Sequence, residues 1–374
     1  MSDWPTQTLE ELCVRITVGH VGSMAHEYVE SGVPFLRSQN IKRGRLDLSS
    51  VKYINKDFHH RLAKSQLQPG DLAIVRTGEP GATALIPDDL GPANCSDIVI
   101  ARPGPDTAAR YLCYAINATA QQFIDAHTVG AVQQHFNVAS AKRLTVAVPP
   151  IAVQKAIASL LGALDDKIAV NDRIAETSYE LAATEHARVA QLAGRACTLG
   201  DVIELAYGKA LPAAQRRPGP VAVYGSGGVS GWHDEPLVRG PGIIVGRKGT
   251  VGSVYWSYRD FFPIDTTFYV RLIDDQLTTE YVYFLLTRLG LSEMNSDSAV
   301  PGLNRSRALS APVQLPNQEL IANFTERVRP LFAMREQTAR QNQTLAKLRD
   351  TLLPELMSGR LRVRDAEKVV EESV

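Results

Sequence analysis

The sequence lacks several features that would place it in common classes of protein. It has no run of about 18 apolar residues, so we expect no transmembrane helix. Its first residues, Met1-Ser2-Asp3-Trp4-Pro5, carry neither a basic nor an apolar segment, so we expect no signal peptide. The four cysteines are scattered without metal-ligand spacing, and we expect reduced thiols in a cytoplasmic protein. These cysteines are Cys13, Cys95, Cys113 and Cys197.

The chain also lacks an excess of charge of either sign. Forty basic residues balance forty acidic residues in 374. A general binder of polyanions is usually basic, so this balance argues against one. It does not exclude DNA binding by basic residues gathered on one face. Each of four local basic clusters could also be ordinary solvated surface. They are Lys42-Arg43-Gly44-Arg45, Arg216-Arg217, Arg247-Lys248 and Arg305-Ser306-Arg307.

Catalytic motifs are missing as well. The sequence has no phosphate-binding Gly-x-x-x-x-Gly-Lys-Ser/Thr loop and no Asn/Asp-Pro-Pro-aromatic motif of an amino-methyltransferase. The glycines Gly246, Gly249 and Gly252 have the wrong spacing for a dinucleotide loop. Ser226 lacks the first glycine of a nucleophile elbow, because Tyr224 occupies that position. We therefore predict a binding protein that is not an enzyme, with no catalytic residue, metal or cofactor of its own.

What the sequence does contain is a long internal repeat. Residues 72–78, Leu-Ala-Ile-Val-Arg-Thr-Gly, correspond to residues 243–249, Ile-Ile-Val-Gly-Arg-Lys-Gly. Further along, Phe136-Asn137 corresponds to Leu303-Asn304, and Gln154 to Gln318. A period of roughly 165–170 residues is that of a duplicated domain, because solenoid units are only 20–50 residues long. The repeat predicts two similar heads related by a pseudo-two-fold axis.

Each copy begins with short strands and ends with a long helical segment. Apolar runs bounded by Gly or Pro predict strands near 33–37, 72–76, 222–224, 242–245, 254–256 and 268–270. Helices are predicted near 108–126 and 279–289. The fold class is α+β, with mixed heads at 1–150 and 195–315, long helices within 151–194 and 316–362, and a frayed acidic tail at 363–374.

The segment from Ile151 to about Leu192 has almost no Gly or Pro and carries one apolar stripe that includes Ile174 and Leu181. As one helix it would span about 60 Å. Two shorter helices, broken at Gly162 or at Asn171-Asp172, are the alternative. Because the second long helix needs an equal partner for its own apolar stripe, we expect the two to pack as an antiparallel coiled coil.

Polar side chains on turns are the candidates for contact with a ligand. Asn, Gln, Arg and Lys side chains can form paired hydrogen bonds with purine bases in the major groove of DNA. The alternative for each residue is a surface loop without a ligand. The candidates in the first head are Arg37, Ser38, Gln39, Asn40, Lys42, Arg76, Thr77, Gln133, Gln134 and His135. Those in the second are Tyr207, Lys209, Tyr224, Ser226, Arg247, Lys248, Asn304 and Arg305.

Several motifs carry a resemblance to one known family. They include Gln154-Lys155-Ala156-Ile157-Ala158, Leu164-Asp165-Asp166-Lys167-Ile168-x-x-Asn171, Leu352-Leu353-Pro354-x-Leu356-Met357-Ser358-Gly359 and Gly246-Arg247-Lys248-Gly249. The chain resembles the specificity (S) subunits of type I restriction–modification systems along nearly its whole length. The first head departs from the pattern, since Arg76-Thr77-Gly78 replaces Gly-Arg-Lys-Gly. This departure suggests a different DNA half-site.

The resemblance implies that each head reads one half of a bipartite double-stranded DNA site. It implies that the helices set the spacer and help to dock two methyltransferase (M) subunits, which bind S-adenosylmethionine, and that two restriction (R) subunits using ATP and Mg²⁺ join in systems that restrict. The residues expected in helix packing and partner docking are Ile157, Leu161, Leu164, Asp165, Ile168, Asn171, Leu348, Leu352 and Leu356.

Two other functions stay open at this point. A related specificity protein would serve another methyltransferase or a single-chain restriction–modification enzyme. A scaffold protein would bind other proteins, and not DNA, with its heads.

Overall fold

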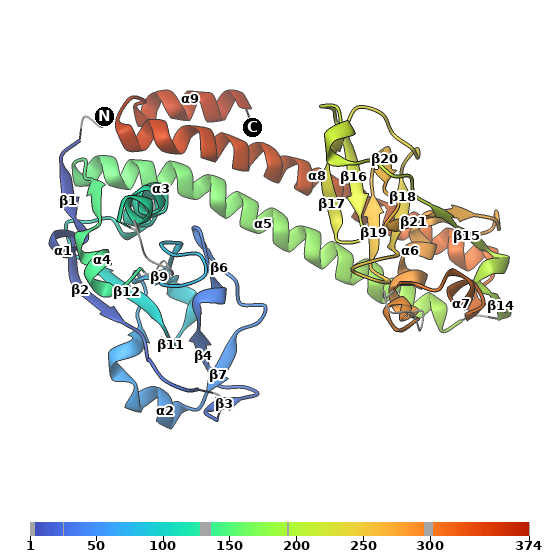
Figure 1. The fold of residues 1–374 in the computed structure, drawn as a ribbon, viewed down its shortest axis with the longest axis horizontal. Helices are drawn as coiled ribbons and strands as arrows, with labels where there is room; N and C mark the ends of the chain where they lie inside the picture. Colours follow the sequence, from blue (N-terminus) through green and yellow to red (C-terminus); the bar gives the residue numbers. More distant parts are fainter. Residues whose placement is uncertain (1–3, 25, 128–135, 193, 295–301, 374) are drawn as a thin grey trace. The chain divides into compact units, whose positions relative to one another are not determined.

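A computed structural model describes residues 4–24, 26–127, 136–192, 194–294 and 302–373. The chain forms two compact units. Unit 1 comprises residues 1–169 and 342–374, and unit 2 comprises residues 170–341. Each unit contains one strand-rich head and part of each long helix (Figure 1). The division between the two units falls within both long helices.

Head 1 is built around an antiparallel sheet of four strands in the order β10-β9-β12-β2. A second sheet of five strands, β3-β7-β4-β11-β8, is formed by strands that come between β2 and β12 in the sequence. It contains the parallel pair β4 and β11. The strands are β1 (Thr6–Thr8), β2 (Cys13–Val18), β3 (Tyr28–Val29), β4 (Val33–Leu36), β5 (Ile41–Lys42), β6 (Arg45–Leu46), β7 (Lys52–Ile54), β8 (Gln66–Leu67), β9 (Leu72–Val75), β10 (Thr83–Leu85), β11 (Ala93–Cys95), β12 (Ile98–Pro103) and β13 (Thr145–Ala147). The helices are α1 (Leu9–Leu12), α2 (Lys56–Arg61), α3 (Ala109–His127) and α4 (Val138–Arg143).

Head 2 has the corresponding four-stranded antiparallel sheet in the order β19-β18-β21-β15. Its second sheet, β17-β16-β20, contains the parallel pair β16 and β20. The strands are β14 (Arg195–Thr198), β15 (Ile203–Tyr207), β16 (Val221–Gly225), β17 (Gly228–His233), β18 (Gly242–Gly246), β19 (Val254–Ser257), β20 (Phe261–Pro263), β21 (Thr267–Leu272) and β22 (Pro312–Leu315). The helices are α6 (Thr279–Arg288) and α7 (Arg305–Leu309).

The strand orders confirm the duplication predicted from the sequence. The order β10-β9-β12-β2 in head 1 corresponds strand for strand to β19-β18-β21-β15 in head 2. Each head also closes with an antiparallel pair of distant strands, β1 with β13 and β14 with β22. Head 1 differs in the segment between β4 and β9, which holds β5 to β8 and α2, whereas the segment between β16 and β18 of head 2 holds β17. The two copies therefore share one scaffold and differ in what is inserted into it.

The two long helices are each unbroken. They are α5 (Ile151–Ala190) and α8 (Gln318–Ser358). The alternative of two shorter helices, broken at Gly162 or at Asn171-Asp172, is wrong because α5 continues through both places. Gly162 instead lets another side chain approach the helix. Arg110 donates a hydrogen bond to the Gly162 carbonyl at 3.2 Å, and a Cβ on Gly162 would lie 2.6 Å from the Arg110 guanidinium carbon.

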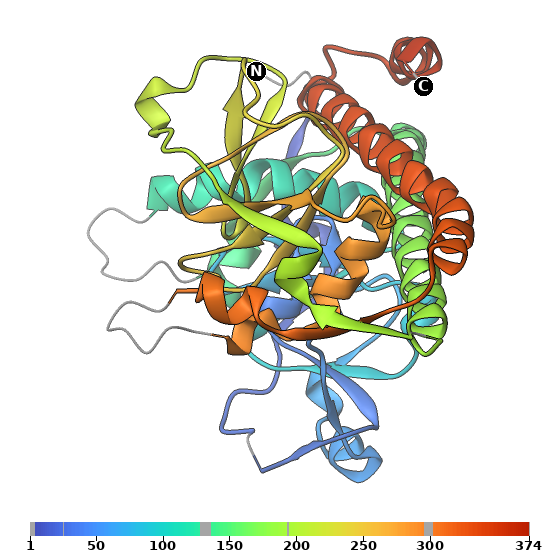
Figure 2. The same cartoon turned by 90° about the vertical axis from the view of Figure 1, so that its right-hand side faces the viewer.

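Within each unit the two helices run antiparallel, as predicted. In unit 1, Asp165 pairs with Arg349 at 2.7 Å. In unit 2, Asn171 Nδ2 donates a hydrogen bond to Gln341 Oε1 at 2.9 Å, and Glu185 pairs with Arg327 at 2.8 Å. Residue numbers on α8 fall as those on α5 rise, which is the pattern of antiparallel neighbours. Figures 1 and 2 show α5 and α8 side by side within each unit.

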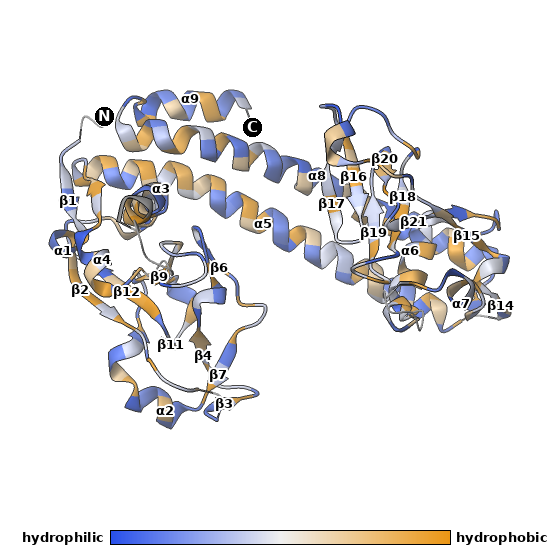
Figure 3. Cartoon of the chain, viewed as in Figure 1, coloured by the Kyte–Doolittle hydropathy of each residue, from blue (hydrophilic) through white to orange (hydrophobic). Residues whose placement is uncertain are grey.

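The apolar stripe of α5 is buried in unit 1. Ile157, Leu161 and Leu164 pack in one core with α3 of head 1 and with Leu352 and Leu356 of α8. Ile168 and Leu348 are partly buried against the same core. Figure 3 shows this part of α5 as mainly apolar.

In unit 2 the predicted stripe does not continue on the buried side. Ile174 is 37% exposed and Leu181 is 56% exposed. The prediction of a single buried stripe along all of α5 is wrong here. The buried side chains of this part of the helix are Asn171, Ser178, Ala182, His186 and Val189.

The prediction of a frayed acidic tail is also wrong. Residues Val363–Ser373 form helix α9. Ala366 is fully buried, and Val363 and Val370 pack against the core of unit 1. These three residues have the spacing i, i+3, i+7, which places them on one helical face. Acidic residues separate them in the sequence, so the composition of the segment does not indicate this apolar face.

No helix in the described parts of the chain is both long enough and apolar enough to cross a membrane.

The same glycine-containing turn follows β9 in head 1 and β18 in head 2. Gly81 donates a backbone hydrogen bond to the Val75 carbonyl at 2.9 Å, and Gly252 donates one to the Gly246 carbonyl at 2.8 Å. Gly81 and Gly252 have φ angles of 80° and 74°, in the left-handed region that favours glycine. A Cβ on Gly81 would also lie 2.7 Å from the Ala120 Cβ of α3. The turn is therefore fixed against the helix behind it.

The buried helix packing predicts a large loss of stability when Leu161 is shortened. Leu161→Ala should lower the free energy of unfolding by about 2–5 kcal/mol, because it removes buried contacts and leaves a cavity. Leu181→Ala is the matched control on the same helix, since Leu181 is 56% exposed. It should change the free energy by less than about 0.5 kcal/mol. Urea denaturation of the two variants measures both values, and equal losses would contradict this packing.

The turn predicts different costs for two glycine substitutions. Gly78 has a φ of 90° but open space within 4 Å of its added Cβ. Gly78→Ala should therefore cost only the backbone strain, about 1–2 kcal/mol. Gly81→Ala adds a clash with Ala120, and overpacking adds about 1–3 kcal/mol. Thermal unfolding should rank Gly81→Ala as the less stable variant, and the reverse order would show that the turn does not pack on α3.

Candidate functional site

Parallel strands bring the predicted turn residues of head 1 to one edge. β4 and β11 are parallel neighbours, with Leu36 paired to Cys95. The carboxyl ends of parallel strands meet at the same edge of a sheet, so Arg37 and Ser96 follow the two strands at the same place. The turn after β9 lies beside them. This edge is the first candidate site.

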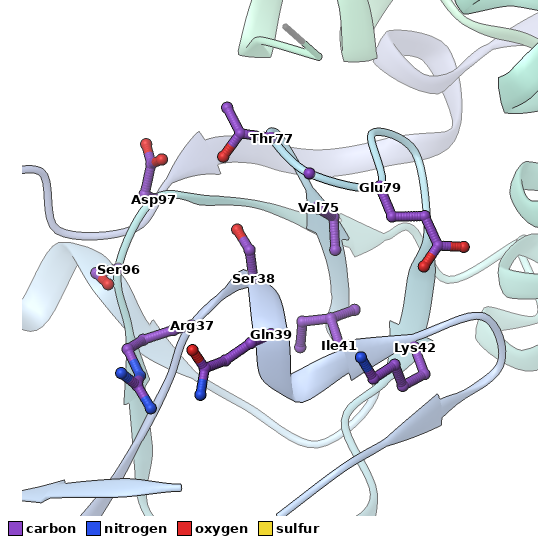
Figure 4. A pocket seen from close by; sticks show the side chains of 11 residues that line it. Arg37, Ser38, Gln39, Ile41, Lys42, Val75, Thr77, Glu79, Ser96 and Asp97 are labelled. Atoms are coloured by element: carbon purple, nitrogen blue, oxygen red, sulfur yellow. The ribbon is translucent and has the colours of Figure 1, made fainter. Parts of the chain in front are cut away.

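A cavity of about 500 Å³ lies at this edge. Figure 4 shows side chains from the segments after β4, β9 and β11 around one space. Five of the residues predicted from the sequence line it, together with two carboxylates, Glu79 and Asp97. The predicted ones are Arg37, Ser38, Gln39, Lys42 and Thr77. The edge therefore presents both hydrogen-bond donors and acceptors.

Arg76 is held beside this cavity by a carboxylate. Its Nη1 donates to the Asp97 carboxylate in an ion pair, and the Arg76 side chain is 22% exposed. Asp97 has a φ of 51°, which is uncommon for a residue other than glycine. The ion pair neutralises the charge of Arg76. Arg43 pairs in the same way with Glu79 at 3.0 Å.

Asn40 is not available to a ligand, in contrast to the prediction. It is fully buried. Its Oδ1 accepts from the Arg37 backbone N–H at 3.0 Å, and its Nδ2 donates to the Asp47 carbonyl at 2.9 Å. Asn40 thus holds the loop that presents Arg37. The candidates Gln133, Gln134 and His135 lie outside the described residues.

Head 2 forms the corresponding edge. β16 and β20 are parallel, with Tyr224 paired to Pro263. Ser226 follows β16 and is half-buried. Its carbonyl accepts from Ser253 Oγ at 2.7 Å and from Tyr255 Oη at 3.2 Å. These contacts fix the loop after β16 against the β18–β19 turn.

Tyr224 faces the core, in contrast to the prediction. It is 9% exposed and packs edge-on against Phe261, with ring centroids 5.9 Å apart. Burial raises the pKa of its hydroxyl above the ordinary value. Residues alternate between the faces of a strand, and both faces of β16 are covered, because Tyr224 lies in one core cluster with Phe261 and Val223 in another with Phe262.

An exposed aromatic ring organises two cations in head 2. Tyr207 ends β15, is 56% exposed and packs against Phe268 with a centroid distance of 5.0 Å. The Arg247 guanidinium carbon lies 5.0 Å from the centre of the Tyr207 ring, and that of Arg305 lies 5.7 Å from it. Both distances are in the range of cation–π attraction. We call Tyr207, Arg247 and Arg305 the arginine–tyrosine cluster.

Hydrogen bonds to backbone carbonyls orient both guanidinium groups. Arg247 Nη1 donates to the Asp265 carbonyl at 3.1 Å. Arg305 Nε donates to the Leu205 carbonyl at 2.7 Å, and its Nη2 lies 3.8 Å from the Glu204 carboxylate. Two further cations, Lys209 and Lys248, are exposed.

Asn304 has a structural role at this edge. Its Oδ1 accepts from the Arg307 backbone N–H at 3.0 Å and caps α7. Asn137 caps α4 in head 1 by the same contact, with Ser140 at 2.9 Å. The residue before each cap, Phe136 or Leu303, is hydrogen-bonded to the turn after β9 or β18.

The loops before α4 and α7 hold the candidate arginines in both heads. The Phe136 N–H donates to the Arg76 carbonyl at 3.0 Å, and the Leu303 N–H donates to the Arg247 carbonyl at 2.8 Å. The backbone of the two arginines is therefore fixed in the same way. Their side chains have different surroundings.

The helix residues predicted to pack or to dock a partner make contacts within this chain. Asp165 accepts from Arg349 and from Tyr114 of α3. Asn171, which is 1% exposed, bonds Gln341. These contacts belong to the packing of the two helices and of head 1 within this chain.

Reasoning from the sequence missed Asp97 and Phe268. Asp97 immediately precedes a buried strand, which was a signal for a residue at the sheet edge. Phe268 looks like an ordinary core residue in the sequence, because only the pairing of β21 with β15 places it opposite Tyr207. Among the described residues, no group of three or more His, Cys, Asp or Glu side chains could hold a metal ion.

Comparisons with known proteins identify the family. The model of the type I restriction modification DNA specificity domain matches residues 1–177 and 196–340. A specificity subunit of the type I restriction enzyme MjaIX from Methanocaldococcus jannaschii is 30% identical over 109 residues, which cover 28% of this chain and 25% of that protein. The HindI specificity subunit from Haemophilus influenzae is 26% identical over 137 residues, which cover 35% of this chain and 29% of that protein. The matched segments thus span less than a third of each relative.

A solved structure has the same fold over most of its length. The S subunit of a type I restriction–modification system from M. genitalium covers 95% of this chain and 96% of its own, with a TM-score of 0.66 and 18% identity. With one family match on each head, the chain belongs to the type I restriction modification DNA specificity family.

Proposed function

We propose that this chain is the DNA specificity subunit of a type I restriction–modification complex. Each head reads one half of a bipartite double-stranded site. The observation that carries this proposal is that the family match falls on both heads, which share one scaffold and present different side chains on it. A duplicated scaffold with unlike turn residues suits a target with two unlike halves.

The physical chemistry of the two edges supports this function. Head 1 offers Arg37, Gln39 and Lys42 around its cavity, and head 2 offers Arg247 and Lys248 on its turn. Side chains of these types hydrogen-bond base edges and phosphates. The scaffold beneath them is rigid, because glycine turns, capped helices and buried amides hold each loop.

The partners form part of the proposal. Two methyltransferase subunits that carry S-adenosylmethionine would dock on the paired helices, and restriction subunits that use ATP and Mg²⁺ would join them in a system that restricts. The chain itself would supply recognition and no catalytic group. Exposed apolar residues on α5, Val170, Ile174 and Leu181, are available for docking.

Modified bases in the host genome test the proposed function. Deletion of the gene should abolish adenine methylation at one bipartite motif, because the methyltransferase would lose its specificity subunit. Single-molecule sequencing of genomic DNA from the strain with and without the gene measures this. A complementing copy should restore the same motif. An unchanged methylation pattern after deletion would refute the proposal and favour a scaffold that binds protein.

The helices predict that spacer length can be changed without changing the half-sites. Seven residues inserted after Asn171 in α5 and seven before Gln341 in α8 lengthen both helices by two turns, about 10.5 Å. This length corresponds to about three base pairs at 3.4 Å each. The gap in the methylated motif should grow by that amount while both half-sites stay the same.

An insertion outside the connection between the units provides the control for this experiment. Seven residues placed after Gly359, between α8 and α9, should leave the gap unchanged. Sequencing of methylated adenines reads both variants. Altered half-site bases with an unchanged gap would show that the helices do not set the spacer.

A further inference from the structure

Two structurally equivalent arginines, one in each head, have differently charged surroundings. β9 and β18 end at Val75 and Gly246, so Arg76 and Arg247 are equivalent. Both accept a backbone hydrogen bond from the loop before the next helix. Equivalent backbone positions should place the two arginines alike relative to DNA, if the heads bind DNA in the same manner.

The surroundings of the two arginines differ in three ways. Asp97 neutralises Arg76, whereas among the described residues no carboxylate forms an ion pair with Arg247. Val18 pairs with Val99 in head 1 where Tyr207 pairs with Phe268 in head 2. The first residue of the capped helix is Val138 in α4 and Arg305 in α7. Among the described residues, head 2 alone therefore has an aromatic ring within 6 Å of two guanidinium carbons at this place.

The arginine–tyrosine cluster has the properties of a phosphate site. The ring of Tyr207 is exposed, and its centre lies within 6 Å of both guanidinium carbons. Cation–π attraction to the ring therefore offsets part of the repulsion between the two cations. Lys209 and Lys248 add positive charge from neighbouring turns. The donors of Arg247 other than Nη1 have no hydrogen bond to described residues. A concentration of charge without carboxylate compensation at Arg247 favours an anion over the neutral edge of a base.

We propose that this cluster binds a phosphate of the DNA backbone, and that head 1 has no equivalent contact because Asp97 neutralises Arg76. This inference rests on the proposed function. It assigns to head 2 a larger share of the salt-dependent binding, and it makes Tyr207 a positioning residue for Arg247. Head 1 would rely more on hydrogen bonds from the side chains around its cavity.

The salt dependence of binding tests the proposal. The full chain is purified in the complex that it forms in its host and titrated onto a fluorescent duplex that carries its methylated motif, at several salt concentrations. Each phosphate contact contributes about 0.9 to the slope of log K against log[salt]. Arg247→Gln should reduce the slope by about 0.9 and weaken binding equally for duplexes with altered half-site bases.

Further variants separate a phosphate contact from a base contact. Arg247→Lys should keep the slope and the sequence preference, because a phosphate needs only the charge, whereas paired hydrogen bonds to a base need the planar guanidinium. Tyr207→Phe should behave as the wild type, since the ring is retained. Tyr207→Ala should bring the slope toward that of Arg247→Gln.

A charge-neutral double variant in head 1 is the matched control. Arg76→Gln combined with Asp97→Asn removes the equivalent arginine without changing net charge, and it should leave the slope unchanged. An equal fall in slope for this control would overturn the proposed difference between the heads. Relaxed preference at one base with an unchanged slope for Arg247→Gln would make Arg247 a base reader and overturn the phosphate site. Absence of motif-dependent binding by the wild type would instead refute the proposed function itself.

Discussion

Burial of the apolar side of α5 is the constraint on which unit 1 depends. Ile157, Leu161 and Leu164 need cover, and it comes from α3 of the head on one side and from α8 on the other. Removal of apolar surface from water is the main driving force for such packing. Polar contacts fix the orientation of the packed elements. The Asp165 carboxylate accepts hydrogen bonds from Arg349 of α8 and Tyr114 of α3, so one carboxylate of α5 contacts both the other helix and the head.

In both heads the backbone construction is constant while the side chains that it presents vary. The four-stranded sheets, the glycine turns and the capped helices correspond. Buried side-chain amides and backbone hydrogen bonds fix the loops, as Asn40 fixes the loop that carries Arg37. Exposed side chains on these turns can change with little effect on stability, because they are not part of the core. The ion pair of Arg76 and the ring beneath Arg247 show how far the same position can diverge.

Periodicity and glycine placement allowed much of the fold to be predicted from the sequence. The two long helices, the main strands and the duplication follow from patterns that local chemistry enforces. Residue type alone failed where tertiary contacts decide the role. Asn40 and Tyr224 are polar residues near turns, yet one bonds the backbone of its own loop and the other packs against Phe261 in the core. In α9, three apolar residues spaced along an acidic segment were outweighed by its composition.

The discontinuity of unit 1 has a consequence for the order of events during synthesis. Unit 2 is complete once residue 341 has emerged from the ribosome, although its residues begin only at 170. Unit 1 begins first but lacks α9 and its part of α8 until residues 342–373 have been made. Domains generally fold as their residues become available. Head 1 is therefore translated before head 2, but its apolar helix surface is covered only after residues 342–373 have been made.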